Sequence, residues 1–152
     1  TQLMAVKELG RRYIAEHLKQ DALELTNSKR LRDYLRFELL GETQEVFAVL
    51  CLDASLRKIA FKKLFYGSVN ACDISINQLL RYAISQQATS IVIAHNHPLG
   101  RPSPSKADLA LTHQIQQACQ LVDIHLIDHC IIALEGSFSF AEQQLIKPEM
   151  QY

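Results

Sequence analysis

Residues 90–97, with the sequence SIVIAHNH, begin with an apolar run and end with two histidines. The run from Ser90 to Ala94 is apolar on both faces, which is typical of a strand covered on both sides. Side chains alternate between the two faces of a strand, so His95 and His97 lie on the same face. The stretch therefore predicts a buried strand that presents two imidazoles at its carboxyl end.

The segments around this strand predict a sheet flanked by helices. Strand patterns recur at residues 45–52, 58–66, 123–134 and 138–140. Helical patterns lie between them, at residues 76–85 and 105–121. Strands that alternate with helices indicate a layered α/β sandwich with a central mixed β-sheet.

The first 41 residues have a different pattern. Residues 3–18 form an amphipathic helical pattern, and a second helix is expected from Asn27 or Ser28 to about Leu40, ended by Gly41. We expect residues 1–41 to be a helical segment that packs on, or leads into, a domain over residues 42–152. The chain begins inside a helical pattern, as expected of a piece of a longer protein.

The composition is that of a water-soluble domain. Of 152 residues, 48% are hydrophobic and 21% charged, and 16 basic residues balance 16 acidic ones, so no net charge attracts nucleic acid or an anionic membrane. No apolar run approaches the roughly 18–20 residues of a membrane span. Four cysteines without C-x-x-C spacing predict buried reduced thiols and a cytoplasmic location: Cys51, Cys72, Cys119 and Cys130.

The histidine pair raises the question of a metal. Two residues along a strand advance by about 6.6 Å, so His95 and His97 can converge on one ion at Zn–N distances of about 2.0–2.1 Å. Their place at the carboxyl end of a buried strand is where open α/β sheets bind ligands. A single H-x-H pair is nevertheless weak evidence, because most such pairs are ordinary surface or hydrogen-bonded histidines.

Asp108 strengthens the metal interpretation, although it has two explanations. Ser105 and Asp108 match the S-x-x-D pattern of a capping box, which satisfies a helix N-terminus. At about 100° per residue, however, Asp108 also lies within about 60° of Leu111 and Ile115, on a stripe that Cys119 and Val122 continue. A carboxylate on a core-facing stripe needs a cation. Two His and one Asp leave one zinc position open, as in catalytic sites.

Glu45 is the candidate general base. It is the polar residue at the start of an otherwise buried strand, on the same face as Phe47. A carboxylate outside the ligand set can take and return the proton of a metal-activated water. Considered on its own, Glu45 is more often explained as a solvent-exposed residue at the end of a strand.

Together these residues resemble a known motif. His-Asn-His-Pro at residues 95–98, followed by Pro-Ser-Lys-Ala-Asp at residues 104–108, resembles the H-x-H-P…S-x-x-D motif of the JAMM (MPN-type) metallopeptidase superfamily. More narrowly it resembles the RadC-like proteins, with H-N-H-P-S-G…P-S-x-A-D. Further matching segments lie at residues 45–53, 65–69, 126–129 and 139–142.

The resemblance implies an α/β sandwich with zinc on His95, His97 and Asp108. It also implies Glu45 as general acid/base and Ser105 as the stabiliser of an oxyanion. JAMM relatives cleave peptide or isopeptide bonds. RadC-like proteins carry a DNA-repair label and usually an N-terminal helix-hairpin-helix segment, which is not in this sequence.

Two departures from the family pattern leave substrate preference open. Leu99 stands where the RadC-like pattern has Ser, and Ile76-Asn77-Gln78 stands where it has Pro-Arg-Glu. Asp128 and His129 fit the family pattern, either behind the metal ligands or in a buried hydrogen bond, and we favour the structural role. His125 lies about 13 Å from His129 along a strand, so the two cannot share an ion.

Two functions from different classes follow. The first is a zinc-dependent hydrolase of a peptide or isopeptide substrate. The second is a module that associates with DNA or a DNA-repair protein and whose metal site is structural or vestigial. The sequence leaves open whether the chain forms a homodimer.

Overall fold

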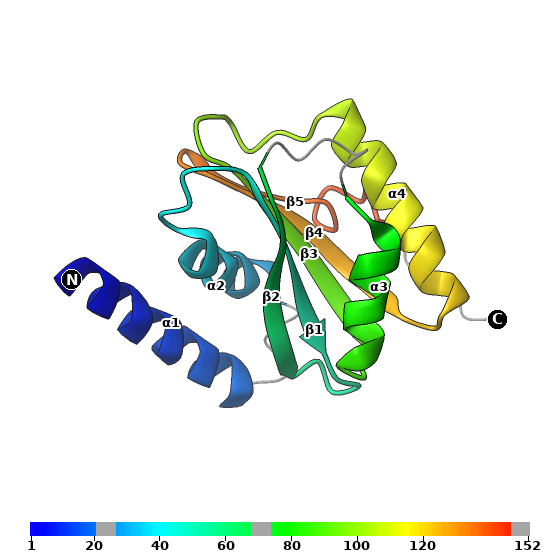
Figure 1. Ribbon diagram of the computed structural model, residues 1–152, viewed down its shortest axis with the longest axis horizontal. Coiled ribbons are helices and arrows are strands. Elements are labelled where there is room, and N and C mark those ends of the chain that lie inside the picture. Colours follow the sequence, from blue (N-terminus) through cyan, green and yellow to red (C-terminus); the bar gives the residue numbers. More distant parts are fainter. Residues whose placement is uncertain (21–26, 68–73, 147–152) are drawn as a thin grey trace.

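A five-stranded mixed sheet lies at the centre of the computed structural model, which describes residues 1–20, 27–67 and 74–146, with side chains left undescribed at 15–20. The strand order is β2-β1-β3-β4-β5 (Figure 1). The strands are β1 (Val46–Leu52), β2 (Lys58–Tyr66), β3 (Ser90–His97), β4 (His125–Ala133) and β5 (Gly136–Ser139). β3 and β4 run parallel, and the other neighbouring pairs are antiparallel. The predicted mixed sheet is confirmed.

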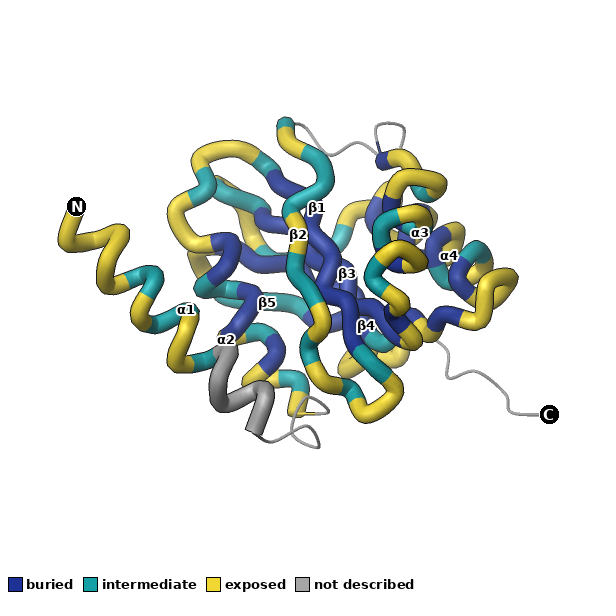
Figure 2. Tube along the Cα trace, turned by 60° about the horizontal axis from the view of Figure 1, so that its bottom comes forward, coloured by how far each residue is buried: buried dark blue, intermediate teal, exposed yellow. Residues whose placement is uncertain are grey.

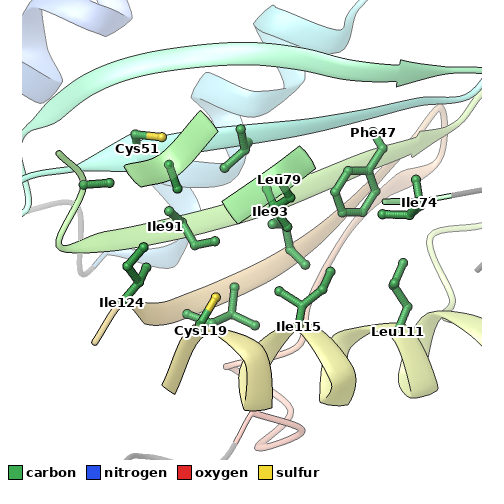
Figure 3. Close-up of a cluster of buried hydrophobic side chains, with 14 of the residues drawn as sticks. Phe47, Cys51, Ile74, Leu79, Ile91, Ile93, Leu111, Ile115, Cys119 and Ile124 are labelled. Atoms are coloured by element: carbon green, nitrogen blue, oxygen red, sulfur yellow. The ribbon is translucent and has the colours of Figure 1, made fainter. Parts of the chain in front are cut away.

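Two helices cover one face of the sheet. A parallel strand pair needs a crossover connection, and α4 (Lys106–Leu121) provides it between β3 and β4. Figure 3 shows Leu111, Ile115 and Cys119 of α4 pointing toward Ile91 and Ile93 of β3. On the same face lies α3 (Ile76–Ser85), within the same apolar cluster. This face therefore contains the larger core.

The opposite face is covered by α2 (Ser28–Leu39). Its apolar side chains, with Leu31 and Leu35 among them, form a second cluster with alternate residues of β1 such as Ala48 and Leu50. Outside it lies α1 (Gln2–Gln20), at the end of the molecule that carries the N-terminus (Figure 1). With both faces covered, every residue of β1 is buried, and β1, β3 and β4 form the buried centre in Figure 2, whereas β2 at the edge is partly exposed.

The helical segment agrees with its prediction. Asn27 caps α2 by accepting a hydrogen bond from Lys29 N, and Gly41 follows the helix with φ of 85°, a conformation that glycine adopts without strain. The structure shows α2 as part of the sandwich itself. The division of the chain at residue 41 stays a prediction.

Several boundaries differ from prediction. β3 extends through both histidines, to His97, and β4 begins only at His125. The predicted start at residue 123 is wrong because Asp123 has φ of 57°, which turns the chain between α4 and β4. β5 occupies residues 136–139 instead of 138–140, since Gly136 pairs with Ala133 and belongs to the strand. Val122 is 40% exposed, so it does not continue the buried stripe of α4.

The thiol prediction holds for the cysteines that the structure describes. Cys51, Cys119 and Cys130 are buried and form no disulfide, and burial raises the pKa of Cys51 to about 11. Cys72 lies outside the described residues. None of the helices in the described ranges is long and apolar enough to cross a membrane.

Asp128 organises the edge of the sheet next to β5. Its carboxylate accepts hydrogen bonds from His129 N at 2.7 Å, Ala141 N at 2.9 Å and Ser139 Oγ at 2.5 Å. The Sγ atom of Cys130 also donates to it, at 3.4 Å. Burial raises the pKa of Asp128, while these donors oppose the shift. The structural role expected of Asp128 agrees with these contacts.

We predict that Asp128→Ala destabilises the fold by about 2–4 kcal/mol, because it leaves several buried donors without an acceptor. Urea denaturation of both proteins gives the change in the free energy of unfolding. The control is Asp33→Ala, which removes an exposed carboxylate on α2 and should change stability by less than about 0.5 kcal/mol. If Asp128→Ala lowered the free energy of unfolding no more than the control does, the structural role of Asp128 would be contradicted.

Candidate metal centre

The carboxyl end of β3 meets the first turn of α4. His95 Nε2 lies 3.0 Å from His97 Nε2 and 3.4 Å from Asp108 Oδ1, and His97 Nε2 lies 4.0 Å from Asp108 Oδ2. With one ligand atom taken from each residue, all three lie within 4.8 Å of one another. The structure thus brings together the three residues that were predicted as metal ligands.

The spacing of these atoms fits a zinc ion. Bonds of about 2.0–2.1 Å at tetrahedral angles place neighbouring ligand atoms about 3.4 Å apart. The closest approaches among the three side chains, between 3.0 and 4.0 Å, bracket that value. Two imidazoles and one carboxylate are also donors that zinc prefers, and three protein ligands leave a fourth position open. The donor set therefore fits a zinc ion.

Burial keeps His95 uncharged. Its side chain is 1% exposed, and burial, reinforced by His97, lowers its pKa to about 4 although Asp108 acts in the opposite direction. A neutral imidazole retains a lone pair, which is the form that binds metals.

Asp108 is placed in agreement with both explanations that the sequence left open. Its Oδ2 atom accepts from Ser105 N at 2.8 Å while Ser105 Oγ accepts from Asp108 N at 3.1 Å, which completes a capping box. Its Oδ1 atom faces His95, and the side chain is buried with Leu111 and Ile115 as helical phase predicted. One carboxylate thus caps α4 and faces the histidines.

His97 is oriented by the loop that follows it. Its Nδ1 atom lies 3.0 Å from the carbonyl oxygen of Arg101. A carbonyl oxygen only accepts hydrogen bonds, so the ring proton sits on Nδ1 and Nε2 carries a lone pair. That lone pair faces His95 and Asp108.

Glu45 lies at the same end of the sheet as His97. The ladder of β1 and β3 ends where Phe47 pairs with His95, so Glu45, two residues before Phe47, and His97, two residues after His95, come to the same end of these strands. The side chain of Asn96 fastens the backbone on both sides, since its Oδ1 accepts from Val46 N at 2.6 Å and its Nδ2 donates to Gln44 O at 3.1 Å.

An open hollow lies in front of the two residues. Both Glu45 and His97 line it, and Leu99 on its rim is fully exposed. The other lining residues are Thr43, Gln44, Pro98 and Gly100. The residue that departs from the family pattern at position 99 therefore presents an apolar side chain beside the candidate site.

Ser105 lies at the start of α4, next to Asp108. Its exposed hydroxyl accepts the capping hydrogen bond and still has its own proton to donate. The role in stabilising an oxyanion stays a prediction.

The structure adds three residues to the candidate set. Asn96 fastens the strand beside Glu45, as described above. His129 Nε2 lies 2.8 Å from His95 Nδ1, and Thr112 Oγ1 lies 2.6 Å from His129 Nδ1. The structural role favoured for the pair Asp128 and His129 therefore applies to Asp128, whereas His129 touches a candidate ligand. Thr112 could have been noticed as a polar residue one turn after Asp108 on the core-facing stripe.

Comparisons with known proteins show which family this chain resembles. The model of the RadC-like JAB domain matches residues 25–145. A UPF0758 protein of Acinetobacter baylyi is 68% identical over 144 residues, which are 95% of this chain and 53% of the relative. A UPF0758 protein of Psychrobacter cryohalolentis is 44% identical over 144 residues, which are 95% of this chain and 63% of the relative.

These relatives place the chain in a family without stating a reaction. The chain spans about half to under two thirds of their length, and their names give no activity. The family model covers most of the chain, including both histidines, Asp108 and Glu45. The chain belongs to the RadC-like JAB domain family.

Proposed function

We propose that this domain is a zinc-dependent hydrolase that cleaves a peptide or isopeptide bond. The observation that carries the proposal is the convergence of His95, His97 and Asp108 next to a hollow that Glu45 lines. Three converging ligands with an open position and a carboxylate nearby are the parts of a hydrolytic metal site. Since the chain spans only part of its relatives, the proposal concerns this domain.

The residues divide the chemistry between them. His95, His97 and Asp108 would hold the zinc, which supplies Lewis acidity that polarises a carbonyl and favours deprotonation of water near neutral pH. Glu45 takes the proton from the attacking water and returns it to the leaving amine. The Ser105 hydroxyl donates to the carbonyl oxygen as negative charge develops on it.

The fixed backbone around Glu45 supports its role. The Asn96 side chain holds Gln44 and Val46, and Gly67 N donates to Glu45 O at 2.9 Å. A proton acceptor whose backbone is held on both sides stays aimed at the same place through the reaction.

We predict that the wild-type protein binds about one zinc ion per chain and that His97→Ala and Asp108→Asn bind it far more weakly. The loss of zinc affinity should exceed the roughly 10–100-fold loss that follows removal of a hydrogen bond to a metal ligand. Metal analysis after dialysis against zinc gives the stoichiometry, and chelator competition gives the affinity. Asn keeps an oxygen that can cap α4, so Asp108→Asn tests the charge with little change to the helix.

The matched control is Asp33→Asn, which changes an exposed carboxylate on α2 and should leave zinc binding unchanged. Equal and negligible zinc in the wild type, His97→Ala and Asp108→Asn would remove the metal site from the proposal.

We predict that Glu45→Gln retains zinc but loses about 10²–10⁴-fold in kcat, because the amide cannot take up a proton. The measurement is turnover of a panel of peptide and isopeptide substrates, with zinc content determined on the same samples. Turnover of a substrate that is equally fast in wild type and Glu45→Gln would rule out Glu45 as the base.

A further inference from the structure

A line of buried polar groups continues inward from His95, away from the candidate metal position. His95 Nδ1 lies 2.8 Å from His129 Nε2, and His129 Nδ1 lies 2.6 Å from Thr112 Oγ1. Thr112 Oγ1 in turn lies 2.7 Å from the carbonyl oxygen of Asp108. The three side chains are at most 2% exposed. We infer that each of these three short contacts is a hydrogen bond with one proton, because buried polar groups rarely go without a partner.

The position of every proton follows from the last contact. The Asp108 carbonyl oxygen has no proton, so the Thr112 hydroxyl must donate to it. Having one proton only, Thr112 Oγ1 then accepts from His129 Nδ1–H. The neutral His129 ring therefore has a bare Nε2, which accepts from His95 Nδ1–H.

His95 consequently carries its proton on Nδ1, and its Nε2 atom presents a lone pair to His97 and Asp108. We propose that Thr112 and His129 are positioning residues that hold His95 in this tautomer and so keep its metal-binding nitrogen free. The consequence for metal affinity rests on the function proposed above, whereas the tautomer itself is a property of the metal-free protein.

If the hydrogen bonds of this line ran in the opposite direction, His95 could not bind a metal ion through Nε2. If His129 donated from Nε2, the proton of His95 would sit on Nε2 and point at His97 Nε2, only 3.0 Å away. That arrangement would need the Thr112 proton to turn toward His129 Nδ1. Thr112 Oγ1 and Asp108 O would then lie 2.7 Å apart with no proton between them. In the proposed orientation the contact without a proton is instead the one between His95 Nε2 and His97 Nε2, 3.0 Å apart, whose lone pairs a bound cation would take up together. The Asp108 carbonyl favours this orientation because it can only accept the Thr112 proton.

The packing keeps His129 in place. Its ring stacks on Phe140 with centroids 4.5 Å apart and an interplanar angle of 12°, and it meets Phe47 nearly edge-on at 6.2 Å. Thr112 lies one turn after Asp108 on α4, so the helix that supplies one ligand also supplies the group that sets the tautomer of another.

The test compares three proteins in the metal-free state: wild type, Thr112→Val and Thr112→Ser. Valine matches threonine in shape but has no hydroxyl, and serine keeps the hydroxyl. Long-range ¹H–¹⁵N correlation NMR distinguishes a protonated from a bare nitrogen in each histidine ring. We expect His95 to be protonated on Nδ1 in the wild type and Thr112→Ser. In Thr112→Val, His129 loses its acceptor, so the His95 proton should move to Nε2.

Zinc affinity, measured by chelator competition, is the second readout. Thr112→Val should bind zinc about 10–100-fold more weakly than the wild type, the usual cost of losing a partner behind a metal ligand. Thr112→Ser should bind nearly as tightly as the wild type.

A wild-type His95 protonated on Nε2 would overturn the proposal, and so would an unchanged His95 tautomer in Thr112→Val. An equal loss of affinity in Thr112→Ser and Thr112→Val would also overturn it, since packing alone would then explain the effect. The wild-type spectrum shows which His95 nitrogen is protonated, so it tests the proposal even if Thr112→Val does not fold. Failure of the proposed hydrolase would appear instead as absent zinc binding or turnover in a wild type that has the expected tautomer.

Discussion

The parallel pairing of β3 with β4 is the constraint on which the rest of the structure depends. Two parallel neighbours cannot be joined by a tight turn, so the chain must leave the end of β3, cross the sheet and return to the start of β4. α4 makes this crossing, and its apolar stripe holds it against the sheet. As a result the first turn of α4 lies beside the last residues of β3, and Asp108 meets His95 and His97.

Polar groups at this junction are buried, and the structure satisfies them by giving several side chains two partners. Asp108 caps α4 through one carboxylate oxygen and faces His95 with the other. Thr112 Oγ1 lies 2.6 Å from His129 Nδ1 and donates to the backbone carbonyl of Asp108. Asn96 completes the pairing of β1 and β3 where the regular ladder ends. Buried groups without such partners would cost about 1–3 kcal/mol each. The polar network is therefore part of what holds the junction together.

The spacing of apolar residues predicted most of the helices and strands. The central strands could be recognised because the sheet is covered on both faces, which makes them apolar on both sides. β2 and α3 have the predicted bounds, and the buried phase of Asp108 follows directly from helical geometry. The predicted boundary near Asp123 was wrong because the backbone angle there overrides the apolar run, and the predicted start of β5 was wrong because Gly136 pairs with Ala133. The contact of His129 with His95 could not be predicted from spacing. It joins residues 34 positions apart, and strand register decides whether they meet.

The sequence by itself determined the apolar faces, the caps of the helices and the set of chemically competent side chains, because these depend on neighbours within a few residues. It also placed His95 and His97 on one face, since alternation along a strand requires it. Only the tertiary structure decided that Asp108 serves as both cap and neighbour of the histidines, that Glu45 and His97 line the same hollow, and that Thr112 and His129 lie behind His95. Those facts depend on the register between strands and on the crossing of α4, which bring distant residues within hydrogen-bonding distance.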